Sequence, residues 1–180
     1  MTVLISFVRH GQTAWNAERR LLGWTDLPLD EIGRSQAVEL GARIERAAYD
    51  AVWASDLRRA VETARLAGWD PTLDGRLREI DFGSLDGLVW SQLEPALRDE
   101  LAAFDGFVAP GGESTEHFVE RLVGFLDGLP AGSHLVVTHG GVIRAVTRLC
   151  GAPGAFPDHA AIHTVNWSRR LLVDVQTPTT

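Results

Sequence analysis

The sequence predicts an α/β domain built on a largely parallel sheet, because short apolar runs of strand length alternate with segments of helical periodicity. The runs at Val3–Val8 and Leu135–Thr138 are continuously apolar at their centres, which is typical of buried strands. No internal repeat, low-complexity segment or linker interrupts the 180 residues. A single domain over residues 1–180 is therefore expected.

The other elements follow from apolar periodicity and from capping and turn residues. Helices are expected over residues 30–48, from an N-cap at Ser55 or Asp56 to Ala67, over 90–104 with a break near Pro95, over 114–126, and over 140–149. Further strands are expected at 51–54, 162–167 and 171–175, whereas 69–90 is expected to be irregular.

Composition excludes several classes of function. The net charge of −7 disfavours nucleic acid and anionic membranes as partners. All 17 basic residues are arginine, so no mechanism can use a lysine Schiff base. Cys150 is the single cysteine, which excludes an intrachain disulfide. No run reaches the roughly 18 apolar residues of a membrane span, and a cytoplasmic protein is expected; a homodimer is left open.

Two predicted strands end in a histidine followed by glycine. Val8-Arg9-His10-Gly11 closes the first, and Thr138-His139-Gly140 closes a later one. Open α/β sheets bind ligands beyond the carboxyl ends of their strands, so His10 and His139 are expected to meet there. Arg9 adds a guanidinium that matches phosphate oxygens, and Gly140 at a helix start offers backbone N–H groups to an anion. The pattern predicts a small, positively charged pocket that binds a phosphoryl group.

Five segments in order resemble the histidine phosphatase superfamily, in its phosphoglycerate-mutase-like branch. They are residues 9–13 (RHGQT) with Asn16, 55–64 (SDLRRAVETA), 77–83 (LREIDFG), 110–114 (PGGES) and 138–141 (THGG). The resemblance runs from about Val3 to Cys150. It implies a three-layer fold, with helices on both faces of a mostly parallel central sheet.

The resemblance also implies roles for individual residues. His10 would be the nucleophile that is transiently phosphorylated, and Glu79 the acid/base carboxylate, ranked ahead of nearby Asp81. Phosphate would be held by Arg9, Arg58 and His139. Neutral hydrogen bonds would come from Gln12 and Asn16, although Asn16 could equally stabilise a turn. No metal and no cofactor are expected.

The function expected from these residues is a metal-independent phosphomonoesterase acting on a small phosphorylated metabolite. Short members of the family include phosphatases for α-ribazole 5′-phosphate, and a compact chain leaves little material to shield a phosphohistidine from water. Three alternatives remain: a mutase of the same family, a non-catalytic binder of phosphorylated ligands, and a metal hydrolase built on His10, His139 and Asp81.

Overall fold

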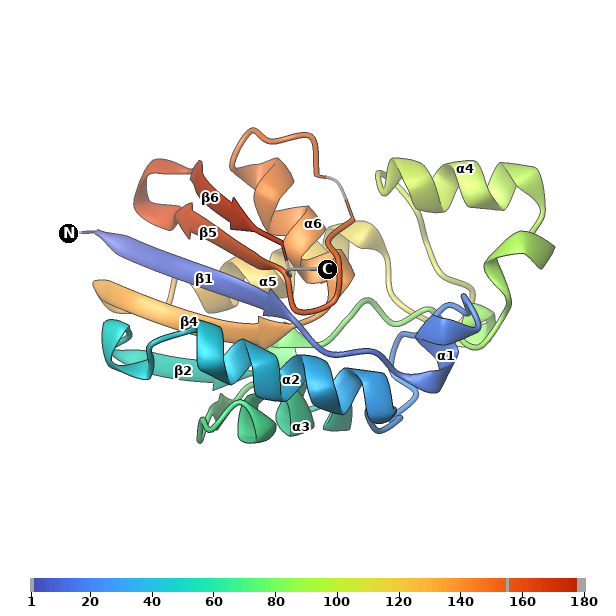
Figure 1. Ribbon diagram of the computed structural model, residues 1–180. Helices are drawn as coiled ribbons and strands as arrows, with labels where there is room; N and C mark the ends of the chain where they lie inside the picture. Colours follow the sequence, from blue (N-terminus) through green and yellow to red (C-terminus); the bar gives the residue numbers. More distant parts are fainter. Residues whose placement is uncertain (1, 155, 178–180) are drawn as a thin grey trace.

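A six-stranded sheet forms the middle layer of the protein, in the order β3-β2-β4-β1-β5-β6 (Figure 1). The computed structural model describes residues 2–154 and 156–177. The strands are β1 (Val3–Arg9), β2 (Ala51–Ala54), β3 (Thr72–Leu73), β4 (Gly132–Thr138), β5 (Ile162–Asn166) and β6 (Leu171–Gln176). The first four are parallel, β5 pairs antiparallel with β1, and β6 pairs antiparallel with β5. The predicted α/β class with a mostly parallel sheet is confirmed.

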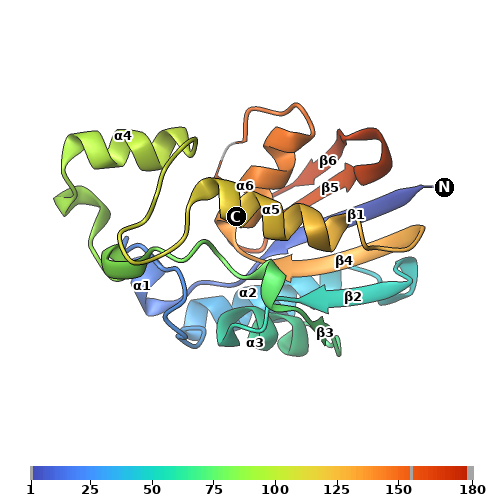
Figure 2. The same cartoon turned by 180° about the vertical axis from the view of Figure 1, so that it is seen from behind.

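Helices cover both faces of this sheet. The α-helices are α1 (Ala14–Ala17), α2 (Glu31–Arg43), α3 (Arg58–Leu66), α4 (Pro95–Ala103), α5 (Thr115–Leu126) and α6 (Gly140–Leu149). Helices α2 and α3 lie on one face, and α5 and α6 lie on the opposite face, which Figure 2 turns toward the reader. Short 3-10 turns are η1 (Arg46–Ala48), η2 (Gly75–Leu77), η3 (Gly83–Leu85), η4 (Trp90–Gln92) and η5 (Trp167–Arg169).

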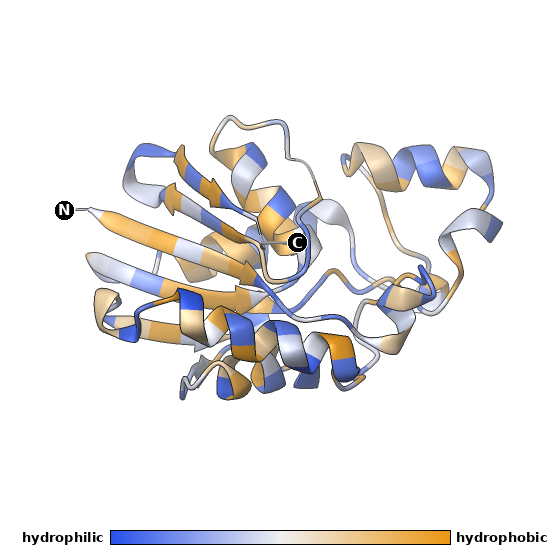
Figure 3. Ribbon diagram, viewed as in Figure 1, coloured by the Kyte–Doolittle hydropathy of each residue, from blue (hydrophilic) through white to orange (hydrophobic). Residues whose placement is uncertain are grey.

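The alternation of side chains along the central strands divides the core in two. In β4, Val136 packs with the cluster under α5 and α6, whereas Leu135 and Val137 pack with the cluster under α2 and α3. A period of two places successive side chains on opposite faces, so a strand buried on both faces must be apolar throughout. In Figure 3, β1 is orange on both sides of a pale central band, the half of β4 that carries the arrowhead is orange, and α2 carries orange and blue patches.

The start of α3 differs from the sequence-based prediction. The helix begins at Arg58, and its N-cap Leu57 makes no side-chain capping bond. Asp56, a predicted cap, is instead held by Arg78 through two hydrogen bonds of 2.7 and 2.6 Å. The exposed N–H of Arg58 donates to Asp26 at 2.6 Å, so the cap comes from a residue far away in the sequence.

The segment between residues 81 and 110 leaves the three layers and carries η3, η4 and α4. Pro95 begins α4 rather than breaking a longer helix, as its missing N–H allows at the first helical turn. Helix α4 stands beside the sheet in Figure 1, next to the carboxyl ends of the strands. Among the described residues, no helix is long and apolar enough to cross a membrane.

Candidate active site

His10 and His139 meet because their strands are neighbours in register. Arg9 of β1 pairs with Thr138 of β4, and the N–H of His10 donates to the carbonyl of Thr138 at 2.9 Å. The imidazole centroids lie 5.2 Å apart with the rings at 60°. The predicted meeting of the two histidines at the carboxyl edge of the sheet is therefore present in the structure.

The surroundings of His10 fix which ring nitrogen carries the proton. Its Nδ1 lies 2.7 Å from the carbonyl oxygen of Gly11. A carbonyl can only accept, so Nδ1 carries the proton and Nε2 keeps its lone pair. Burial, assisted by the positive charge of Arg59, holds the pKa of His10 well below its usual value. The ring is therefore neutral, as a nucleophile must be.

The side chain of Glu79 is buried against the N-terminus of helix α6. Its Oε2 accepts from the N–H of Gly141 at 2.9 Å, and its Oε1 accepts from the N–H of Ile80 at 3.0 Å. Burial raises the pKa of this carboxyl above its usual value, against the lowering effect of these N–H groups and of Arg59 and Arg9. The helix N-terminus that was predicted to receive an external anion thus holds the carboxylate of Glu79.

The backbone beside Glu79 is anchored from two sides. Arg121 of α5 donates to the carbonyls of Arg76, Arg78 and Glu79 at 2.7, 2.9 and 2.9 Å. The same guanidinium pairs with Glu113 at 2.7 Å. Trp24 Nε1 also donates to the Glu79 carbonyl, at 2.9 Å. These bonds fix the position of the carboxylate, and no motif in the sequence pointed to this role of Arg121.

The structure brings Arg59, and not the predicted Arg58, to the two histidines. The Arg58 side chain is 54% exposed and pairs with Glu62 on the outer surface of α3. Arg59 is fully buried and donates to the carbonyls of Gly23 and Thr25 at 2.7 and 3.1 Å. Its charge lowers the pKa values of His10 and His139. Helical spacing was the missed signal, because Arg59 lies one turn before buried Thr63.

Three other predicted residues have structural contacts. Gln12 is directed toward α2, where its Nε2 donates to Asp30 at 3.0 Å, so it does not line the cavity. Asn16 does line the cavity, but its Oδ1 also accepts from the N–H and the hydroxyl of Thr13 at 3.1 and 2.9 Å. The turn-stabilising alternative for Asn16 is therefore realised, together with a position at the site. Gly140 lies against Phe156, whose ring a β-carbon there would meet at 2.4 Å.

Several buried side-chain nitrogens at this site have no hydrogen-bond partner within the described part of the protein. They are Arg9 Nε, Arg59 Nε and both ring nitrogens of His139. Buried polar groups are almost always hydrogen-bonded, and such a group left alone costs about 1–3 kcal/mol. Burial lowers the pKa of Arg9 to about 10, which still leaves its guanidinium charged at neutral pH. A phosphoryl group would supply acceptors for the two guanidinium N–H groups and for the protonated ring nitrogen of His139.

A cavity of about 650 Å³ opens over His10, Glu79, Arg9 and Asn16. His159 also lines this cavity, and its Nδ1 lies 2.9 Å from the carbonyl oxygen of His10. The sequence motifs did not indicate this residue. In residues 2–154 and 156–177, no group of three or more His, Cys, Asp or Glu side chains is arranged to hold a metal ion. Asp81 accepts from the N–H of Gly83 at 2.9 Å.

Comparison with known proteins agrees with this geometry. The crystal structure of TTHB049 from Thermus thermophilus is 43% identical, covers 97% of this chain and 99% of its own, and superposes with a TM-score of 0.91. A probable phosphoglycerate mutase GpmB from Cronobacter sakazakii is 38% identical over 163 residues, 83% of this chain and 75% of that protein. A putative alpha-ribazole-5′-P phosphatase from Escherichia coli K-12, at 24% identity and a TM-score of 0.79, shares the fold over 100% of this chain and 97% of its own.

Residues 5–176 match the family model described as histidine phosphatase superfamily (branch 1). The match includes His10, Glu79 and His139. Together with the relatives above, it places the chain among enzymes that act as phosphatases or mutases. The protein therefore belongs to branch 1 of the histidine phosphatase superfamily.

Proposed function

We propose that the protein is a metal-independent phosphomonoesterase that hydrolyses a small phosphorylated metabolite through a phosphohistidine at His10. Nε2 of His10 attacks phosphorus, and the bond from phosphorus to the alcohol oxygen breaks. Glu79 gives its proton to the departing oxygen. In the second step Glu79 takes a proton from water, whose oxygen attacks phosphorus and releases phosphate from His10.

The observation that carries this proposal is the pairing of a neutral, oriented imidazole with a protonatable carboxyl in one cavity. The Gly11 carbonyl fixes the tautomer of His10, and the Gly141 N–H fixes the carboxylate of Glu79. A module that only bound phosphorylated ligands would need cations but neither a nucleophile nor an acid. The arrangement therefore favours catalysis over binding alone.

Stabilisation of the transferred phosphoryl group is assigned to Arg9, Arg59, His139 and Asn16. Phosphoryl transfer needs charge neutralisation at the equatorial oxygens and little other chemistry from a protein. Arg9 reaches the cavity wall, and its NH1 is held by the carbonyl of Pro157 at 2.7 Å. Arg59 and His139 are fully buried behind the cavity lining and have unpartnered nitrogens, and the His139 ring centroid lies 5.2 Å from that of His10.

Hydrolysis is favoured over transfer to a second substrate because the cavity is open at its rim. Phe156 is 60% exposed and Trp90 37% exposed, so water can enter the cavity from its rim. A mutase must keep water from the phosphohistidine. Phosphoglycerate mutase activity is the second candidate, favoured by the name of the Cronobacter relative. The α-ribazole phosphatase relative makes α-ribazole 5′-phosphate one metabolite to assay.

The test compares His10→Ala with His117→Ala, a matched change of an exposed histidine on α5. With p-nitrophenyl phosphate in the presence of a chelator, the wild type and His117→Ala should release phosphate, and His10→Ala should not. Rapid quenching with labelled substrate should trap an acid-labile, alkali-stable phosphoenzyme. Turnover by His10→Ala, or activity that chelator abolishes, would refute the proposal. Isomerisation of 3-phosphoglycerate with a bisphosphate primer would instead favour the mutase.

A further inference from the structure

We propose that the alcohol part of the substrate carries a flat apolar group, aryl or heteroaryl, that packs against Phe82, Trp90 and Phe104. This inference rests on the proposed hydrolysis at His10 and identifies the substrate class of the same site. It distinguishes such esters from phosphates of small hydroxy acids, including phosphoglycerate.

The cavity over His10 is much larger than a phosphoryl group needs. Its volume of about 650 Å³ lies within the range of pockets that enclose drug-sized ligands, roughly 300–1,000 Å³. A three-carbon acid would fill only a small part of it. The part of the cavity beyond the phosphate-binding residues is therefore suited to a larger substrate group.

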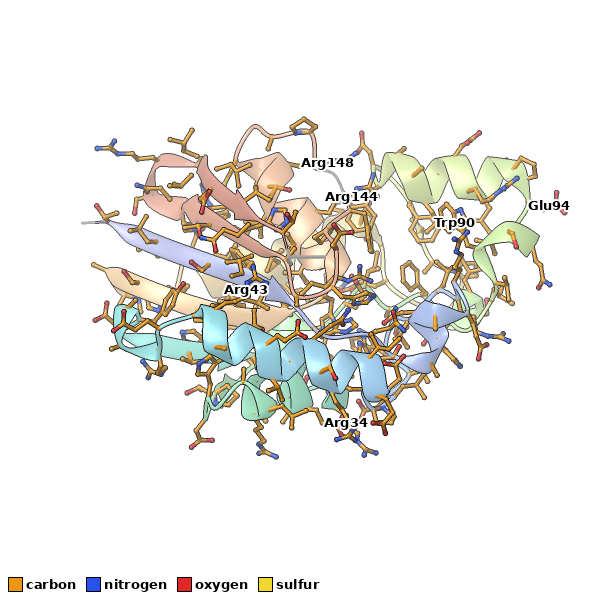
Figure 4. The ribbon with its side chains drawn as sticks, viewed as in Figure 1. Arg34, Arg43, Trp90, Glu94, Arg144 and Arg148 are labelled. Atoms are coloured by element: carbon orange, nitrogen blue, oxygen red, sulfur yellow. The ribbon has the colours of Figure 1, made fainter. Side chains whose placement is uncertain are left out.

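The part of the cavity lining outside the proposed catalytic and phosphate-binding residues, which we call the far wall, is mostly apolar and aromatic. Phe82, Trp90 and Phe104 line it together with Leu21, Leu22 and Leu101. Trp90 comes from η4, just before α4, and Figure 4 shows it beneath that helix. Aromatic rings bind flat apolar partners by stacking or edge-to-face contact, beyond the gain from buried area. A tryptophan left 37% exposed at a cavity wall is suited to such a partner.

The arginines of the far wall are engaged by the protein itself. Arg144 donates to the carbonyls of Gly154, Leu101 and Ala102, and its guanidinium lies 5.2 Å from the Phe104 ring centroid. Figure 4 shows Arg144 directed from α6 toward α4. Arg20 pairs with Glu18 and donates to the carbonyl of Gly87 at 2.8 Å. These guanidiniums brace the wall, so their capacity to bind a substrate carboxylate is reduced.

Arg19 also borders the cavity, but it is exposed to solvent. An exposed ion pair contributes little, because both ions lose hydration and salt screens them. A carboxylate at Arg19 would therefore add less selectivity than an apolar ring enclosed by the aromatic wall. The contacts favour a substrate that is anionic at the phosphate and apolar at its other end.

The test uses three esters of primary alcohols, so that the leaving oxygen is chemically similar: 2-(1-naphthyl)ethyl phosphate, n-propyl phosphate and glycerol 3-phosphate. The naphthyl ester should have a kcat/KM about a hundredfold above the other two. Trp90→Ala should remove about tenfold of that preference, and Trp90→Phe should restore most of it. Leu88→Ala, a change at a residue that is 43% exposed and outside the cavity lining, is the control.

Binding of the corresponding non-hydrolysable phosphonates, measured by calorimetry, separates this inference from the proposed reaction. Tighter binding of the naphthyl phosphonate, lost in Trp90→Ala, would support the apolar subsite even if no ester were hydrolysed. Equal kcat/KM for the naphthyl and propyl esters, with equal phosphonate affinities, would overturn the inference and leave the hydrolase proposal intact. A preference for 3-phosphoglycerate over the naphthyl ester would also overturn it.

Discussion

Gly141 is the position at which one added methyl group should damage catalysis most selectively. A β-carbon at this residue would lie 2.1 Å from Oε1 of Glu79, whereas real contacts of this kind stay above 3.0 Å. In Gly141→Ala the carboxylate must therefore move by about one ångström, and a misplacement of that size can cost about a hundredfold in rate. The displacement also strains the 2.9 Å bond from the Gly141 N–H to Oε2. We expect kcat to fall by about a hundredfold.

The assay is steady-state hydrolysis of p-nitrophenyl phosphate, because it separates kcat from KM. The Michaelis constant should change little, since Arg9 and the other phosphate-binding donors stay in place. Gly124→Ala is the matched control: it lies in helix α5, and a β-carbon there has nothing within 4 Å. This control should keep full activity and gain up to about 1 kcal/mol of helix stability. A Gly141→Ala enzyme that retains more than half of the wild-type kcat would refute the assignment of Glu79 as the acid/base group.

Three further predictions concern charge at the site. Arg59→Lys should lower kcat/KM by about a hundredfold, because the change removes the guanidinium that donates to the carbonyls of Gly23 and Thr25 and the Nε–H proposed to bind phosphate. The control Arg58→Lys should stay within twofold of wild type, since Arg58 is exposed. Burial lowers the pKa of His159 to about 4, so acidification from pH 7 to pH 5 protonates this residue mainly in the unfolded chain. The protein should lose about 2 kcal/mol of unfolding free energy through His159 over that range, and urea titrations of His159→Gln should lack this part of the loss. Because the pKa of Glu79 is raised, its acid form persists above the usual carboxyl range, and kcat/KM should fall as the pH rises through that pKa. Glu79→Gln should flatten this limb of the pH profile. An unchanged limb would contradict the assignment of Glu79 as the acid/base group.

Most of the fold could be predicted because its elements are encoded locally. The strands β1 and β4 are apolar on both faces, and the N-caps Asp30 and Ser114 start α2 and α5 with side-chain bonds to backbone N–H groups. The cap of α3 could not be predicted in this way, since Asp26 reaches it only after the chain has folded. The antiparallel direction of β5 was also not encoded locally, because strand direction depends on the path of the connecting chain.

The candidate site shows the same division between local and distant information. His10 and His139 could be predicted to meet, because each directly follows a buried strand and parallel neighbours end at one edge. Arg58 and Arg59 are adjacent and chemically identical, so composition cannot choose between them. Which of the two arginines is buried depends on the rotation of α3 about its axis. Arg58 shares a helix face with Glu62, whereas Arg59 shares one with Thr63. The Thr63 hydroxyl accepts from the N–H of Gly11 at 3.0 Å.

Helical spacing, unlike composition, favours Arg59 over Arg58 as the buried arginine. Ala60, Thr63 and Ala64 form the small-residue face of α3 that packs on the sheet, and Arg59 lies on the Thr63 side of that face. Small residues on a buried helix face leave room for a long side chain beside them, and a buried guanidinium needs specific acceptors. The carbonyls of Gly23 and Thr25 meet that need. The pattern of small residues on α3 therefore indicates Arg59, and not Arg58, as the buried arginine of this motif.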